Sequence, residues 1–157
     1  MSDSLAFPVA IDAPAEVRVA GQRWFRRPEL HVTTFTPEAL APATGLDAEL
    51  LTLIGERLHD ELTAVRPIHF DGRVAVVSDP DGRRTLVAFC DVEGLEQVYE
   101  RLSVIAGCEL PRPPTHVTLY TAQPGMAGIG LSTIADVDAK AFALGRAAAA
   151  SVLADLK

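Results

Sequence analysis

The stretches Glu29-Leu30-His31-Val32-Thr33-Thr34-Phe35 and Thr115-His116-Val117-Thr118-Leu119-Tyr120 each contain the tripeptide His-Val-Thr. Both copies lie among apolar and β-branched residues, which predicts that each one forms a β-strand. Side chains two positions apart on a strand share a face, so each His points the same way as its Thr and the Val between them points away. Two such strands side by side would form a cleft lined by His31, Thr33, His116 and Thr118.

These four side chains suit acid–base chemistry on a phosphate. Opening a 2′,3′-cyclic phosphodiester requires a base that activates water and an acid that protonates the departing oxygen. Histidine serves both roles, because its unperturbed pKa of ~6.5 lets it give and take protons near neutral pH. The Thr hydroxyls can donate to the non-bridging phosphate oxygens, where charge is held. The scheme needs no cofactor, and the sequence leaves open which histidine is the base.

Periodicity and turn formers predict the remaining elements. The loose alternation of apolar and polar residues at 16–27 indicates a strand or hairpin arm, and apolar spacing of three and four residues indicates helices. Proline and glycine mark the boundaries. The expected elements are a loop at 37–45, a helix at 47–65 with Asp47 as N-cap, strands at 68–77 and 84–92 joined by a turn, a helix at 93–106, a glycine-containing loop at 123–128 and an Ala-rich helix at 138–156.

The order of elements between the two motifs is strand, helix, two strands, helix, strand. This order predicts an α+β fold, in which antiparallel sheets carry helices on their outer faces. The two motifs are too far apart for a solenoid repeat. We therefore expect a single domain over residues 1–157, made of two pseudo-symmetric lobes with a central cleft.

Composition limits the partners and the location. The chain has 157 residues, 48% of them hydrophobic, and a formal net charge of -7. Such a charge disfavours binding to DNA or long RNA, so RNA ends are a less favoured partner than a small anionic substrate. There are only two cysteines, no signal-peptide pattern and no apolar run long enough to cross a membrane. We expect a soluble, cytoplasmic protein with no membrane partner, and its oligomeric state stays open.

The paired His-x-Thr motifs with apolar flanks resemble those of the two-histidine (2H) phosphoesterase superfamily. That superfamily includes cyclic nucleotide phosphodiesterases and the bacterial enzymes named 2′-5′ RNA ligases. The resemblance extends from about residue 16 to about residue 135. It implies a bilobal α+β fold in which His31, Thr33, His116 and Thr118 face one another across the cleft. It also implies a metal-independent hydrolase acting on a small cyclic phosphodiester, such as a nucleotide.

Candidates for substrate contact lie near the motifs. Tyr120 is two residues beyond Thr118, so strand periodicity predicts that it shares the motif face, where it could stack on a base or donate to phosphate. Guanidinium groups match phosphate oxygens in bidentate fashion. Among the arginines near the first motif and on the predicted hairpin, Arg23 and Arg73 rank above Arg26 and Arg27.

Two other kinds of site are disfavoured. No metal is expected, because the four histidines lack close ligand spacing and no Cys or carboxylate stands beside the motif histidines. The loop at 125–130 lacks the pattern of a Walker phosphate loop, so we interpret it as an edge or lid beside the second motif. The alternatives that remain are a non-catalytic nucleotide- or phosphate-binding module and 2′-5′ RNA ligation or RNA end processing.

Overall fold

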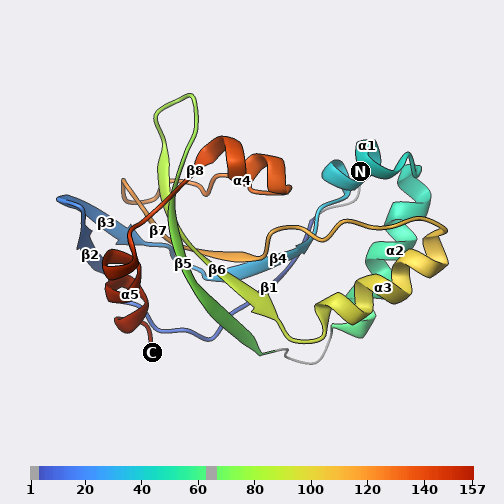
Figure 1. The fold of residues 1–157 in the computed structure, drawn as a ribbon, viewed down its shortest axis with the longest axis horizontal. Coiled ribbons are helices and arrows are strands. Elements are labelled where there is room, and N and C mark those ends of the chain that lie inside the picture. The colour runs from blue at the N-terminus through green and yellow to red at the C-terminus, as the bar shows by residue number, and fades with distance from the viewer. Residues whose placement is uncertain (1–3, 63–66) are drawn as a thin grey trace.

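The computed structural model describes residues 4–62 and 67–157. Within these residues the strands form one antiparallel sheet of eight strands, in the order β1-β4-β7-β6-β5-β8, and the hairpin β2–β3 joins it where β3 pairs with β7 (Figure 1). Five helices accompany the sheet, so the α+β class is confirmed. The strands are β1 (Leu5–Pro8), β2 (Glu16–Val19), β3 (Gln22–Arg26), β4 (His31–Phe35), β5 (Ile68–Ser78), β6 (Arg84–Val92), β7 (His116–Thr121) and β8 (Ala141–Ala143). The helices are α1 (Pro37–Thr44), α2 (Ala48–Glu61), α3 (Leu95–Ala106), α4 (Ile134–Lys140) and α5 (Arg146–Ala154).

Most elements with a strong local pattern form where the sequence predicts them. Both motif strands are present as β4 and β7, and β5 and β6 form the predicted hairpin. Asp47 caps α2, since its side chain accepts a hydrogen bond of 2.8 Å from the Leu50 N–H. Gly107 ends α3 in the left-handed conformation, at φ 75°. The predicted extension of α2 over 63–65 lies outside the described residues.

The prediction of a loop at 37–45 was wrong, because these residues form α1. Pro37 occupies the first turn of the helix, where a backbone N–H has no intrahelical partner to lose. Gly45 then ends the helix in the left-handed conformation, and its N–H donates to the Ala41 carbonyl. The proline and glycine therefore mark the two ends of a short helix.

The single Ala-rich helix predicted at 138–156 was also wrong. The segment divides into α4, β8 and α5, and β8 pairs with Ala75–Val77 of β5. Alanine favours a helix in isolation. Pairing with the open edge of β5 overrides that preference, and α5 begins only after Gly145.

The expected division into separate sheets and two lobes is not confirmed, because one sheet contains all the strands described. The two halves of this sheet meet at a narrow junction. Strands β4 and β7 are joined through one residue pair, Val32 with Val117. On one side of it lies β1–β4, and on the other β7–β6–β5–β8.

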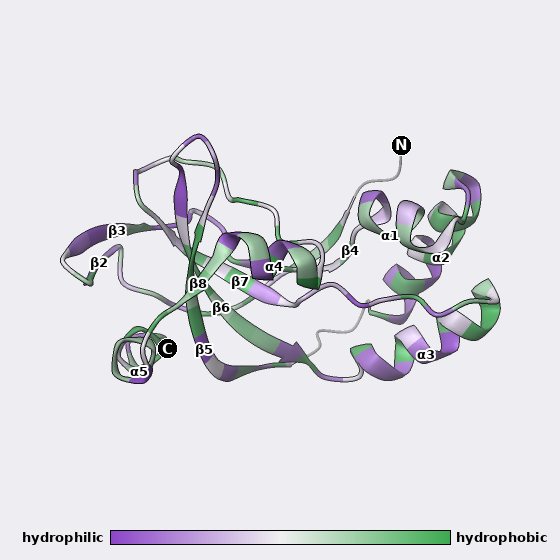
Figure 2. Ribbon diagram, turned by 45° about the horizontal axis from the view of Figure 1, so that its top comes forward, coloured by the Kyte–Doolittle hydropathy of each residue, from purple (hydrophilic) through white to green (hydrophobic). Residues whose placement is uncertain are grey.

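The sheet has two apolar faces of different size. The larger core combines residues of β4, β6 and β7 with buried side chains of α2, α3 and α5. A smaller cluster on the other face contains Val87 and Phe89 of β6 together with Ile129 and Leu131, and α4 packs against it through Val137. Figure 2 shows the resulting hydrophobic character of the central strands. The motif side chains lie on the same face as the small cluster, since they line a cavity together with Ile129 and Leu131.

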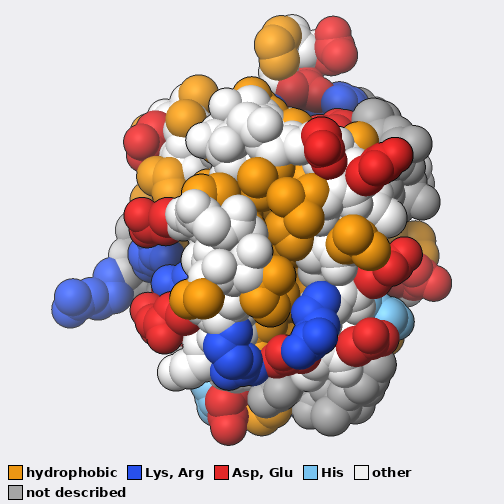
Figure 3. Space-filling model, turned by 90° about the vertical axis from the view of Figure 1, so that its right-hand side faces the viewer, with side chains coloured by type: hydrophobic (Ala, Val, Ile, Leu, Met, Phe, Trp, Pro, Cys, Tyr) orange, Lys and Arg blue, Asp and Glu red, His pale blue; other side chains and the backbone are white. Residues whose placement is uncertain are grey.

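The helical end of the molecule exposes some apolar side chains. Leu53 of α2 and Val104 and Ile105 of α3 are all more than half exposed. Figure 3 views this end and shows hydrophobic side chains down its middle, with charged groups on both flanks. No helix among the described residues combines the length and the apolar character needed to cross a membrane.

Gly55 allows a test of the close packing of α2 against β4. A Cβ at Gly55 would lie 2.9 Å from Cε2 of Phe35, a core residue of β4 with 1% of its surface exposed. Glycine to alanine in a helix normally stabilises by about 1 kcal/mol. Here overpacking of a buried ring costs about 1–3 kcal/mol. We expect Gly55→Ala to lower the free energy of unfolding by about 1 kcal/mol in urea titration. Gly130→Ala, which meets no atom within 4 Å, is the control, and a more stable Gly55→Ala variant would contradict this packing.

Candidate active site

The pairing of β4 with β7 passes through the centre of both motifs. Val32 lies opposite Val117 in an antiparallel pair, and both side chains are fully buried in the larger core. Their neighbours along each strand therefore point to the other face. Antiparallel geometry places His31 across from Thr118 and Thr33 across from His116. The two motifs are thus related by an approximate local twofold axis through the valine pair.

All four motif side chains line one cavity of about 290 Å³. His31 is exposed, whereas Thr33, His116 and Thr118 are half-buried. The segment from Gly128 to Ser132 forms a second wall, and Arg27 and Thr36 contribute as well. The structure therefore brings together the four residues that the sequence singled out.

His116 is held in one orientation and one tautomer. Its Nδ1 lies 2.8 Å from the Pro114 carbonyl oxygen. A carbonyl oxygen can only accept, so Nδ1 carries the hydrogen in the neutral ring and Nε2 keeps its lone pair. The ring also packs near Phe89 of β6, with 6.3 Å between the ring centroids.

The surroundings of His116 disfavour its charged form. Burial lowers the pKa of His116 below its usual 6.5. The hydrogen bond to Pro114 opposes that change, and the nearby His31 adds to it by charge repulsion. These surroundings favour the neutral ring, in which Nε2 is unprotonated and its lone pair can accept a proton.

Sequence reasoning ranked Arg27 below two other arginines, but among the described residues it is the arginine that lines the cavity. Its backbone N–H donates to the Leu119 carbonyl at 2.9 Å, which ties it to β7. Its Nη1 donates to the Met126 carbonyl at 2.6 Å. The guanidinium thus joins the cavity wall to the glycine-containing loop. Sequence gave no reason to choose Arg27, because the contact joins residues far apart in the chain.

The two preferred arginines lie elsewhere. Arg23 is exposed on β3, pairs with Glu16 of β2 and does not line the cavity. Arg73 pairs with Asp71 at 2.7 Å, and its guanidinium lies 4.7 Å from the centroid of the Phe89 ring. Arg73 therefore stacks on a ring that packs near His116, without reaching the cavity lining itself.

The prediction that Tyr120 shares the motif face was wrong. On β7, Thr118 pairs with Val87 and Tyr120 pairs with Leu86, so Leu119 is an extra residue with no partner on β6. This β-bulge reverses the alternation of side chains beyond it. Tyr120 consequently lies in the larger core with 0% of its surface exposed.

The glycine-containing loop closes one side of the cavity. Ile129 and Leu131 are buried in the small apolar cluster, and Gly128 and Gly130 line the cavity together with them. A Cβ on either glycine would meet no atom within 4 Å. The alternating pattern anchors the loop by its apolar residues and leaves room at its glycines.

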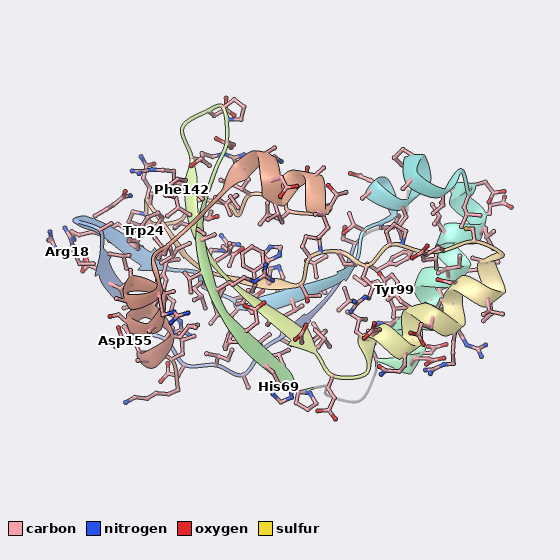
Figure 4. The ribbon with its side chains drawn as sticks, viewed as in Figure 1. Arg18, Trp24, His69, Tyr99, Phe142 and Asp155 are labelled. Carbon is pink, nitrogen blue, oxygen red and sulfur yellow. The ribbon has the colours of Figure 1, made fainter. Side chains whose placement is uncertain are left out.

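The other histidines and possible metal ligands lie apart from this cavity. His69 stands at the beginning of β5, exposed and 3.5 Å from a Glu93 carboxylate oxygen (Figure 4). Over residues 4–62 and 67–157, no three His, Cys, Asp or Glu side chains are close enough together to hold a metal ion. No family model, curated protein or solved structure matches the chain, so the functional assignment depends on the geometry above.

The environment of His116 leads to a prediction for NMR titration. We expect its pKa to lie below 6.5, with Nδ1 protonated in the neutral ring, and we expect His31→Ala to raise that pKa by removing a positive neighbour. His59→Ala on the exposed face of α2 should leave it unchanged.

The same shift makes stability depend on pH. The unfolded chain binds the proton of His116 more readily than the folded one, so this group lowers the free energy of unfolding as the pH falls through about 6.5. A pKa of His116 above 6.5 would contradict the buried, neutral assignment.

Proposed function

We propose that this protein is a metal-independent phosphodiesterase of the two-histidine kind, hydrolysing a small cyclic phosphodiester such as a 2′,3′-cyclic nucleotide. One observation supports it above the others. Two His and two Thr from equivalent positions of two strands surround a single cavity of about 290 Å³. In this proposal the cavity is the central cleft, and the halves of the sheet that meet at Val32 and Val117 correspond to the two lobes.

The two histidines differ in ways that favour different roles. His116 has a free Nε2 lone pair and a lowered pKa, which suits a general base that takes a proton from water. The water oxygen then bonds to phosphorus, and the bond from phosphorus to one ribose oxygen breaks. His31 is exposed to solvent, and in this proposal it acts as the general acid that donates a proton to the departing oxygen. The histidines exchange protonation states, and solvent restores them.

The hydroxyls of Thr33 and Thr118 would hold the phosphate. Each lies opposite the histidine of the other strand, so the phosphate would sit between two donors and two proton-transfer groups. Hydroxyl donors aimed at non-bridging oxygens stabilise the charge that these oxygens hold through the reaction.

Arg27 supplies a positive charge in the cavity wall of a chain with net charge -7. A cation focused in a cavity can attract a small anion even when the whole surface repels polyanions. Two free cysteines, Cys90 and Cys108, are consistent with the proposed cytoplasmic location.

The reaction is tested by ³¹P NMR with each of the four 2′,3′-cyclic nucleotides and EDTA present. We expect the cyclic phosphate signal to convert to the signal of one monoester. The variants His31→Ala and His116→Ala should each abolish turnover, and their circular dichroism spectra should match that of the unsubstituted protein. The rate should follow a bell-shaped pH profile set by the pair.

A fully active His116→Ala variant would refute the mechanism. If a nucleotide raises the unfolding temperature without being cleaved, the protein is a binding module instead. Joining of RNA ends, followed by gel electrophoresis, would indicate the ligase alternative.

Arg27 and Arg23 form a matched pair for testing the cationic wall. Removing a charged hydrogen-bond donor to phosphate costs ~1.5–3 kcal/mol. Arg27→Ala should therefore raise KM for the cyclic nucleotide on the order of tenfold or more. Arg23→Ala, on the exposed hairpin, should leave KM within about twofold, as expected for an exposed pair. Equal effects of the two substitutions would show that Arg27 does not contact the substrate.

A further inference from the structure

A second cavity, of about 260 Å³, adjoins the catalytic one. Thr36 and Ser132 line both cavities, so a ligand can extend from one into the other past these two side chains. We call the second cavity the apolar slot. Its walls come from α1, from α3, from the segment at 111–113 and from the residues that lead into α4.

The walls of the slot are largely apolar. Ala39 and Ala43 are one helical turn apart on α1, so their small side chains lie on the same side of the slot. Tyr99 of α3 forms another part, with its ring fixed by a hydrogen bond of 2.5 Å from its hydroxyl to the Thr34 carbonyl (Figure 4). Pro111 and Pro113 add two rigid rings.

The rim of the slot carries two side chains whose exposure needs an explanation. Ile134, at the beginning of α4, is 63% exposed although it is large and apolar. Arg112 is also exposed and is paired with Glu96 only at 3.9 Å. A guanidinium stacks on an aromatic face, and an exposed isoleucine can cover a ring edge, so both would gain contacts from an aromatic ligand.

We propose that the apolar slot binds a flat aromatic ring of the substrate, which in a nucleotide is the base, while the phosphate lies between His31 and His116. This inference rests on the proposed function and adds the part of the substrate that the catalytic cavity does not hold. The two cavities together, of about 290 and 260 Å³, fall within the size range of ordinary small-ligand sites, ~300–1,000 Å³, whereas each alone is at or below its lower end.

The composition of the slot also sets its selectivity. Stacking on apolar and guanidinium surfaces works for any base, because every base has a π-face. The Tyr99 hydroxyl is already committed to Thr34, and the Thr133 hydroxyl accepts a hydrogen bond from the Asp136 N–H. The hydroxyls of Thr36 and Ser132 lie where the slot meets the catalytic cavity, and Arg112 lies at the rim, so few polar groups face the edge of a base inside the slot. The slot therefore selects for a ring without selecting among bases.

The experiment compares kcat/KM for adenosine 2′,3′-cyclic phosphate, uridine 2′,3′-cyclic phosphate and the base-free methyl riboside 2,3-cyclic phosphate. Stacking of one base is worth ~1–3 kcal/mol, so both nucleotides should exceed the base-free compound by roughly tenfold or more. Ala39→Phe fills the slot and should bring this ratio toward one. Ala150→Phe, which adds the same ring to an exposed alanine of α5, is the matched control and should keep the ratio.

A second variant and a binding measurement make the test independent of folding and of turnover. Ile134→Ala removes an exposed side chain and should lower the ratio without affecting the unfolding temperature. Calorimetry with adenosine 2′-monophosphate and ribose 2-phosphate measures the same preference in binding.

The outcomes separate the two proposals. Absence of turnover, together with a binding preference that Ala39→Phe removes, would refute the proposed hydrolysis and support the slot. Turnover of all three compounds at equal kcat/KM, or a ratio that neither Ala39→Phe nor Ile134→Ala changes, would refute the slot and leave the hydrolysis standing.

Discussion

The antiparallel pair of Val32 and Val117 is the contact on which the candidate site depends. It is the point where two halves of the sheet join, and it sets which residues of the two motifs face each other. A shift of one residue in this register would turn one motif toward the core and replace its His and Thr with an apolar side chain. Burial of both valines at 0% exposure opposes such a shift, because it would bring imidazole and hydroxyl groups into the apolar core. The apolar residue in the middle of each motif therefore fixes the position of the polar residues on either side.

The cavity face has its own apolar support, and that support affects the chemistry. Phe89 and Val87 pair with His116 and Thr118 across β6 and β7, and the buried Ile129 and Leu131 cover them from the loop. This packing removes water from one side of His116, and the Pro114 carbonyl fixes its hydrogen. His31 has no such cover, since it lies at the exposed beginning of β4. Two histidines in equivalent positions of the motif thus occupy unequal environments, which is the condition for dividing the roles of acid and base.

The sequence predicts what depends on local pattern and misses what depends on tertiary contact. The motif strands, the β5–β6 hairpin and the cap at Asp47 follow from neighbouring residues, and all three were predicted. Tyr120 lies in the core and not on the motif face because of a β-bulge, and this bulge exists only when β7 pairs with β6. The contact of Arg27 with Met126 requires the loop to fold back across the sheet, and no local pattern records it. Residues 141–143 of the C-terminal segment form a strand because an edge of β5 is available, and helix propensity carries no information about such an edge.

The short strand β8 has a consequence for the behaviour of the protein in concentrated solution. β5 has eleven residues and, without β8, would offer a long row of unpaired N–H and C=O groups to any other chain. Three residues of β8 pair with Ala75–Val77, near the C-terminal end of that row, and the turn into α5 carries the chain away from it. Nearer the beginning of β5, an irregularity between Phe70 and Val74 interrupts the regular row. At the opposite end of the sheet, β1 has four residues and closes with Pro8, which cannot donate a ladder hydrogen bond. Both edge strands of the sheet are therefore poor templates for the addition of further strands. The cavity at the centre of the sheet can stay accessible to small molecules without making the protein prone to fibre-like association.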